Sequence, residues 1–142
     1  MSLVPRKLSA TLALAAAIAL AGPVAAQEPV PTSLVSIYHV APGKHLDFLK
    51  WVAAREAIDR EAGVPATQWY AHMDGDSWDY VSIGPDIDDA QSDKIDELSR
   101  ARGLTVGPRA GLELRETINA HTDTFAAGPL TAAQLLARVS PP

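Results

Sequence analysis

Three of the four histidines in this sequence are expected at strand ends, where an imidazole can accept or donate a proton near neutral pH. They are His39, His72 and His121. If the strand that starts at His121 runs antiparallel beside the strand that ends at His39, the two imidazoles approach each other at one rim of the sheet. Asp123 follows His121 by two residues and shares its strand face, so it could orient an imidazole. We predict His39, His121 and Asp123 as the candidate catalytic residues.

Two other interpretations apply to these histidines. The structural one is that His39 and His121 bond to backbone groups or to Asp123. The other is a metal or haem site, since imidazole is a common ligand. Strand alternation argues against a metal, because it is expected to turn His72 away from His39, and no linear ligand spacing is present. We therefore predict no metal and no cofactor.

Aromatic side chains are the second group that could form a site. Most aromatic residues on strands pack in a core or an interface. The alternative is a flat apolar wall for an aromatic ligand, and His72 is expected at the same end of the sheet as Trp78. The predicted ligand-binding residues are Tyr38, Trp51, Trp69, Tyr70, His72, Trp78 and Tyr80.

Composition excludes several classes of function. The chain has 142 residues and no cysteine, so it is long enough for one domain and has neither a disulfide framework nor a thiolate site. Hydrolase elbows, phosphate-binding glycine loops, dinucleotide fingerprints and zinc-protease motifs are also missing from the sequence. Without Arg6 and Lys7, ten basic residues face seventeen acidic ones, a formal charge of −7. Such a surface repels phosphate backbones, so nucleic acid is not an expected partner.

The amino terminus has the pattern of a bacterial export signal. Arg6 and Lys7 precede an alanine-rich apolar run, and Gly22-Pro23 breaks that run ahead of small residues. A retained membrane anchor is the competing interpretation, but the run is shorter than the roughly 20 residues a bilayer requires. We predict cleavage after Ala26 and a periplasmic or secreted protein with no membrane segment after cleavage. Residues 27–33 are expected to form a short tether, and residues 34–142 a single domain.

The predicted elements follow the change from alternating to helical periodicity. Strands are expected at 34–41, 67–73, 78–83 and 121–127, and helices at 44–62, 86–102, 109–120 and 131–139, the last capped by Thr131. In the first helix, Leu46, Phe48, Leu49, Val52, Ala53 and Ala57 are expected to form the buried stripe. Arg55 and Asp59 are expected mostly on the opposite side. This order predicts a ferredoxin-like βαββαβ sandwich, an α+β fold with one four-stranded antiparallel sheet.

Three segments carry a resemblance to a known group. YHVAPGKHLDFLKWV at 38–52, WDYVSIGP at 78–85 and HTDTFAAGP at 121–129 resemble the dimeric α+β barrel superfamily, which holds the antibiotic-biosynthesis monooxygenase-like domains. The resemblance implies a homodimer in which two sheets pack face to face, and a ligand cleft between sheet and helices. The haem-degrading relatives place an Asn on the first strand, where this sequence offers His39.

Two functions follow from that resemblance. The first is an exported dimeric barrel that binds a small apolar or aromatic molecule without transforming it. The second is a cofactor-independent monooxygenase or isomerase, in which His39 or His121 handles a proton. We favour the first, because a small exported domain with no cofactor motif has no evident electron partner.

Overall fold

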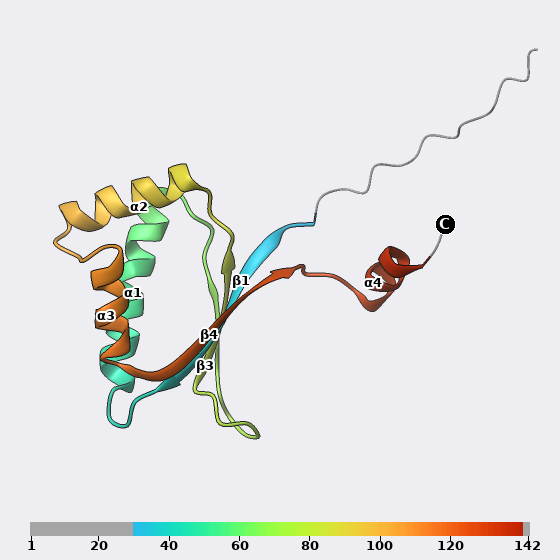
Figure 1. Ribbon diagram of the computed structural model, residues 1–142, viewed down its shortest axis with the longest axis horizontal. Coiled ribbons are helices and arrows are strands. Elements are labelled where there is room, and N and C mark those ends of the chain that lie inside the picture. Colours follow the sequence, from blue (N-terminus) through green and yellow to red (C-terminus); the bar gives the residue numbers. More distant parts are fainter. Residues whose placement is uncertain (1–29, 141–142) are drawn as a thin grey trace, which may run out of the picture.

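The computed structural model describes residues 30–140, which form one sheet and its helices (Figure 1). The predicted signal peptide at 1–26 lies outside the described residues. The elements follow in the order β1 (Thr32–Val40), α1 (His45–Ala62), β2 (Gln68–Ala71), β3 (Tyr80–Pro85), α2 (Asp89–Ala101), α3 (Pro108–Arg115), β4 (Ile118–Ala127) and α4 (Ala132–Val139).

The four strands form one antiparallel sheet in the order β2-β3-β1-β4. This is the order expected for a ferredoxin-like βαββαβ chain, and the predicted fold class is confirmed. Helices α1, α2 and α3 lie on one side of the sheet, whereas α4 stands apart beyond the end of β4 (Figure 1). Among the residues that the structure describes, no helix covers the other side, which we call the open face.

Two of the predicted boundaries assign residues of the sheet to other segments. Strand β1 begins at Thr32, so the last two residues of the predicted tether belong to the sheet. The helix expected to reach residue 120 ends at Arg115, and β4 begins at Ile118, which pairs with Val40. Ile118 is buried in the core beside Val40 and Phe48. Burial of Ile118 as a strand residue therefore outweighs the helical periodicity that Leu114 and Ile118 share.

Helix α1 is rotated relative to the predicted stripe. Phe48 is fully buried, and Ile58 and Ala62 are buried with it, but Leu46 is 62% exposed and Leu49 42%. Trp51, Arg55 and Asp59 are partly buried on the side that faces the sheet. The predicted placement of Arg55 and Asp59 on the far side is therefore wrong. The stripe cannot be recovered by hydrophobicity, because the inward side of α1 contains charged residues and the outward side contains leucines.

The helix ends agree better with the sequence pattern. Gly63 takes the left-handed conformation at the end of α1 (φ 86°) and donates its N–H to the Arg60 carbonyl. A side chain other than glycine would be strained there. Thr131 caps α4, as predicted, through a capping box with Gln134, and Asp88 caps α2 in the same way with Gln91. These caps determine where the helices start.

The buried core occupies one end of the sheet–helix interface. Val40, Phe48 and Ile118 form its centre, and Tyr38 and Tyr80 pack against it. The ring of Phe48 stacks on Tyr80 with centroids 5.4 Å apart and lies tilted against Tyr38 at 5.1 Å. This aromatic cluster holds α1 against β1 and β3 at that end. It leaves the other half of the interface to be filled by different residues.

Candidate functional site

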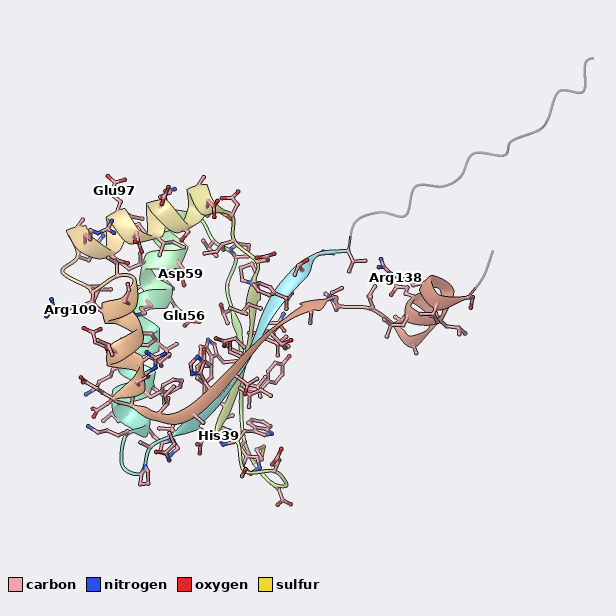
Figure 2. The ribbon with its side chains drawn as sticks, viewed as in Figure 1. His39, Glu56, Asp59, Glu97, Arg109 and Arg138 are labelled. Atoms are coloured by element: carbon pink, nitrogen blue, oxygen red, sulfur yellow. The ribbon has the colours of Figure 1, made fainter. Side chains whose placement is uncertain are left out.

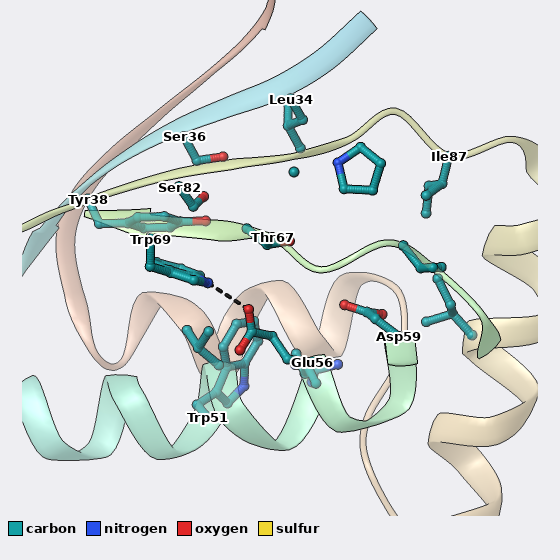
Figure 3. Close-up of a pocket in the computed structure, with 16 residues that line it drawn as sticks. Leu34, Ser36, Tyr38, Trp51, Glu56, Asp59, Thr67, Trp69, Ser82 and Ile87 are labelled. Carbon is teal, nitrogen blue, oxygen red and sulfur yellow. Dashed lines mark hydrogen bonds between the residues drawn. The ribbon is translucent and has the colours of Figure 1, made fainter. Parts of the chain in front are cut away.

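A cleft of about 230 Å³ lies between the sheet and α1, beyond the aromatic core (Figure 3). The sheet side is contributed by alternate residues of β1, β2 and β3 together with Thr67. The helix side is contributed by one face of α1, and Ile87 and Ile95 close the far end. The cleft is lined by Leu34, Ser36, Tyr38, Trp51, Val52, Arg55, Glu56, Asp59, Val64, Thr67, Trp69, Ser82, Gly84, Pro85, Ile87 and Ile95.

The cleft exists because the sheet carries small side chains where the helix passes over it. Ser36 and Ser82 are paired across β1 and β3, and both are buried. Gly84, which has no side chain, pairs with Leu34 in the same register. Large residues at these positions would fill the space between the sheet and α1, as Tyr38 and Tyr80 do at the other end. The hollow therefore depends on the small residues that neighbouring strands place on the helix-facing side of the sheet.

Trp69 forms one wall and its orientation is fixed by a hydrogen bond across the cleft. The indole Nε1 donates to Glu56 Oε1 at 2.7 Å, joining β2 to α1 (Figure 3). On its other side, the Trp69 ring stacks on Tyr38 with centroids 5.6 Å apart. An indole held by both contacts cannot swing into the hollow. The wall is preorganised.

Trp51 forms part of the helix wall and is held by a polar cluster on the side of α3. Its Nε1 donates to Glu113 Oε2 at 3.2 Å, and the Arg55 guanidinium lies over its ring, 4.2 Å from the centroid. Glu113 Oε2 also accepts from Thr105 Oγ1 at 2.7 Å and pairs with Arg55 at 3.4 Å. Hydrogen bonds from Thr105 and Trp51, with a smaller contribution from Arg55, lower the pKa of Glu113.

Asp59 brings a carboxylate to the cleft without a protein partner. Glu56 and Asp59 both project from α1 towards the sheet (Figure 2). Within residues 30–140 the Asp59 carboxylate makes no hydrogen bond and no ion pair. Burial of the carboxylate, and then the charge of Glu56, raise its pKa, against an opposing effect of Arg55. The cleft thus combines aromatic walls with one acceptor that is free to bind a ligand.

The predicted aromatic site residues divide between two faces of the sheet. Tyr38, Trp51 and Trp69 line the cleft, and their role in ligand binding stays a prediction. Tyr80 lies on the same side but packs in the core, 5.9 Å from the ring of His45. Tyr70 belongs to the open face, where it borders a separate hollow with Val35 and Ile83.

The remaining two predicted ligand residues lie away from the cleft. His72 alternates with Ala71 at the end of β2 and therefore shares the open face with Tyr70. Its ring packs edge-on against Trp78 at 5.1 Å. Neither residue lines the sheet–helix cleft. The structure therefore does not bring His72 and Trp78 to the cleft that Tyr38, Trp51 and Trp69 line.

The histidines do not converge. His121 pairs in register with Tyr38, which faces α1, whereas His39 pairs with Ala120 and faces the opposite side. His39 shares the open face with His72, contrary to the predicted separation of these two, and its Nδ1 lies 3.1 Å from the Ser77 carbonyl oxygen. One predicted pair is present: His121 Nε2 is 3.2 Å from Asp123 Oδ2, and the His121 ring stacks on Tyr38. The catalytic role of His39, His121 and Asp123 stays a prediction.

The sequence did not indicate the residues that give the cleft its charge. Arg55, Glu56 and Asp59 follow one another at one- and three-residue spacing on α1, which places them on adjoining parts of one helix face. Charged residues on a helix are ordinarily placed on its solvent-exposed side, and for this reason the sequence pattern does not assign these three to the cleft. The available signal was the pair Ser36 and Ser82, two small residues on the helix-facing side of central strands. In residues 30–140 no three His, Cys, Asp or Glu side chains group as metal ligands would.

No helix within that described range is long and apolar enough to cross a lipid bilayer.

Comparisons with known proteins give similarities of fold. Neither a protein-family model nor a curated protein matches this chain. Among solved structures, it is similar to SnoaB, a cofactor-independent oxygenase from Streptomyces nogalater, at 17% identity and a TM-score of 0.48, over 71% of this chain and 95% of that one.

Two further structures show a similar likeness. An uncharacterised NIPSNAP domain protein from Burkholderia xenovorans is 15% identical with a TM-score of 0.46, over 68% of this chain and 93% of that one. A dimeric ferredoxin-like protein of unknown function from Thermobifida fusca is 8% identical with a TM-score of 0.46, over 71% and 93%. The sheet order and the antiparallel pairing show that the chain is a ferredoxin-like α+β protein.

Proposed function

We propose that this protein binds a small apolar or aromatic molecule in the sheet–helix cleft and does not transform it. The observation that carries the proposal is the cleft itself, a hollow of about 230 Å³ whose indole walls are held in place by hydrogen bonds. Concave apolar sites with few, placed polar groups are the usual form of small-molecule sites. A hollow kept open between preorganised aromatic rings is a feature that a purely structural domain does not need.

The enzymatic alternative, a cofactor-independent monooxygenase or isomerase, needs a proton-handling histidine in the cleft. His39 faces away from it, and His121 lies on the far side of the Tyr38 ring. Neither imidazole borders the hollow. The arrangement of these side chains therefore favours binding over a reaction that either histidine would serve.

The proposal includes a homodimer joined through the open face. That face presents Val35, Ile37, Tyr70, Val81 and Ile83, and no helix of the described chain covers it (Figure 1). Packing against a second copy would remove this apolar surface from water, and a two-fold axis makes such an interface self-complementary. The sheet–helix cleft lies on the other side of the sheet and would stay accessible in the dimer.

The proposal also includes export to a bacterial periplasm or medium. Its support is the pattern of residues 1–26, with Arg6 and Lys7 ahead of an alanine-rich run and small residues at the end. Expression of the full chain in a bacterium, followed by fractionation and amino-terminal sequencing, tests this part. A mature chain that begins at Gln27 in the periplasm or medium is the expected result, and a cytoplasmic chain that retains Met1 would contradict it.

Binding is tested on residues 27–142 by native mass spectrometry and by titration with 2-phenylethanol, a neutral aromatic probe, followed through Trp fluorescence. We expect a dimer that quenches or shifts its emission on titration. Ser82→Leu, which fills the hollow, should abolish the response, and Ser92→Leu on exposed α2 should keep it. If Ser82→Leu unfolds, Leu34→Phe is the milder variant that also narrows the cleft. An unchanged response in the folded cleft variants would refute binding in the cleft.

A further inference from the structure

The charges around the cleft do not cancel. The Arg55 guanidinium pairs with Glu113 at 3.4 Å and donates two hydrogen bonds to the Thr105 carbonyl, so its charge is compensated on the side of α3. Glu56 accepts a hydrogen bond from the indole of Trp69, and this neutral donor brings no positive charge to the carboxylate. With Asp59, two carboxylates therefore line the hollow, and neither forms an ion pair within residues 30–140. The cleft is expected to repel anions and attract cations.

Asp59 stands where two hollows meet. A second one of about 190 Å³ shares Glu56, Asp59 and Trp69 with the cleft, and continues past Arg60 and Pro65 towards the surface. Lys94, a cation of α2, is engaged elsewhere, because its Nζ donates to the Ala62 carbonyl oxygen at 2.9 Å. The free carboxylate thus lies at the polar end of an aromatic cavity. A ligand whose ring occupies the cavity can place a polar group beside it.

We infer that the cleft selects molecules that combine an aromatic ring with a protonated amine, the ring lying against Trp51 and Trp69 and the ammonium donating to the carboxylate of Asp59. The inference rests on the proposed binding function and names the class of its ligand. An ionised carboxylate only accepts hydrogen bonds, so it requires a donor from the ligand. An ammonium supplies up to three donors and a compensating charge, whereas a neutral alcohol supplies one donor and a carboxylate ligand supplies none.

The raised pKa of Asp59 is consistent with this assignment. Burial and the neighbouring Glu56 disfavour the ionised carboxylate. A bound cation favours the ionised form and offsets both effects. The binding of an amine is therefore expected to lower the pKa of Asp59. Arg55 acts in the same direction, but its own charge is shared with Glu113.

The inference is tested with three probes that share a phenylethyl group and differ in charge: 2-phenylethylamine, 2-phenylethanol and 3-phenylpropanoate. Each is titrated into residues 27–142 at pH 7 by calorimetry, with wild type, Asp59→Asn and the matched control Asp93→Asn on exposed α2. A charge-assisted hydrogen bond at a partly exposed site corresponds to roughly tenfold in affinity. We expect the amine to bind about tenfold tighter than the alcohol to wild type and Asp93→Asn, and the carboxylate to bind weakest.

In Asp59→Asn the amine and the alcohol should bind with similar affinity. Equal affinities of amine and alcohol for wild type would overturn the inference and leave the proposed binding function standing, since the neutral probe still binds. If Asp59→Asn still binds the amine more tightly than the alcohol, the inference is likewise overturned and the proposed binding function stands. If none of the three probes binds, both fail. A separate readout is the pKa of the Asp59 carboxyl group, followed by NMR with a carbon-13 label on the Asp side chains. This pKa should fall only when the amine is bound.

Discussion

The indole N–H of Trp69 donates to Glu56 Oε1 at 2.7 Å, across the space between β2 and α1. This bond joins the sheet to the helix at the point where the core ends and the cleft begins (Figure 3). Because Glu56 is charged and partly buried, the bond contributes both to stability and to the position of the wall. Its removal should therefore affect the protein in two measurable ways.

Glu56→Ala leaves the indole N–H without its acceptor. We expect a loss of about 1–2 kcal/mol in the free energy of unfolding, measured by urea denaturation, and a red shift in Trp emission as Trp69 gains mobility. Glu56→Gln keeps an acceptor and should lose less. Glu97→Ala, on the exposed side of α2, is the control and should stay within about 0.5 kcal/mol of wild type. An equal loss in Glu56→Ala and Glu97→Ala would show that the bond contributes nothing.

Substitutions along α1 should separate its buried side from the stripe that hydrophobicity predicts. Phe48 is fully buried among Tyr38, Trp69 and Tyr80. Phe48→Ala is expected to cost about 3–5 kcal/mol or to prevent folding, because it leaves a cavity in the core. Leu46→Ala, on the exposed side of the same helix, should change stability by less than about 0.5 kcal/mol. Thermal denaturation of the two variants checks this, and a larger loss in Leu46→Ala would contradict the observed rotation of α1.

The raised pKa of Asp59 gives stability a pH dependence of known sign. The folded chain binds the Asp59 proton more tightly than the unfolded chain, whose pKa is near 3.8. The stability from protonated Asp59 is therefore present below pH 3.8 and is lost as the pH rises through the raised folded-state value. Asp59→Asn removes this dependence. It should be more stable than wild type at neutral pH, by a Tm difference on the order of 2 °C, and equal to it in acid.

The prediction for Asp59 is checked by the difference in Tm between variant and wild type at each pH. The other carboxylates are the same in both proteins, so their contributions to the pH dependence cancel in this difference. Asp93→Asn, which alters an exposed carboxylate of α2, should show no such trend. A difference that grows towards acid would reverse the sign and contradict a raised pKa.

A substitution on the open face should prevent dimer assembly and leave ligand binding in the cleft unchanged. Ile37→Lys places a charge among Val35, Val81 and Tyr70 at the proposed dimer interface. We expect monomers in native mass spectrometry, with unchanged binding of 2-phenylethanol, because Ile37 points away from α1. Leu46→Lys, on the exposed side of α1, is the control and should remain dimeric. A dimeric Ile37→Lys, or a monomeric wild type, would contradict assembly through this face.

Helix α4 should be dispensable for the rest of the fold. It is capped by its own Thr131 and Gln134 and stands apart from the sheet, with Leu135, Leu136 and Val139 exposed (Figure 1). Removal of residues 132–142 should leave the Tm of the sheet and its helices within about 2 °C of wild type, because no core residue is lost. A large loss of stability would show that α4 packs on the protein in solution.

The sequence by itself determined the order of elements, the antiparallel sheet and several boundaries. Alternation in β1, the helical run that Gly63 ends and the cap at Thr131 are local signals, each produced by backbone geometry within a few residues. A fold that places sequential elements side by side can be predicted from such signals. The resemblance of three segments to one superfamily led to the same fold.

Only the tertiary structure decided which side chains meet. Strand pairing places His121 opposite Tyr38 and His39 opposite Ala120, and this single residue of offset separates the two imidazoles onto different faces. The rotation of α1 is decided by Phe48, which must reach the core, and it brings Arg55, Glu56 and Asp59 over the small residues Ser36 and Ser82. No local pattern encodes that match, because it depends on the volumes of residues far apart in the chain.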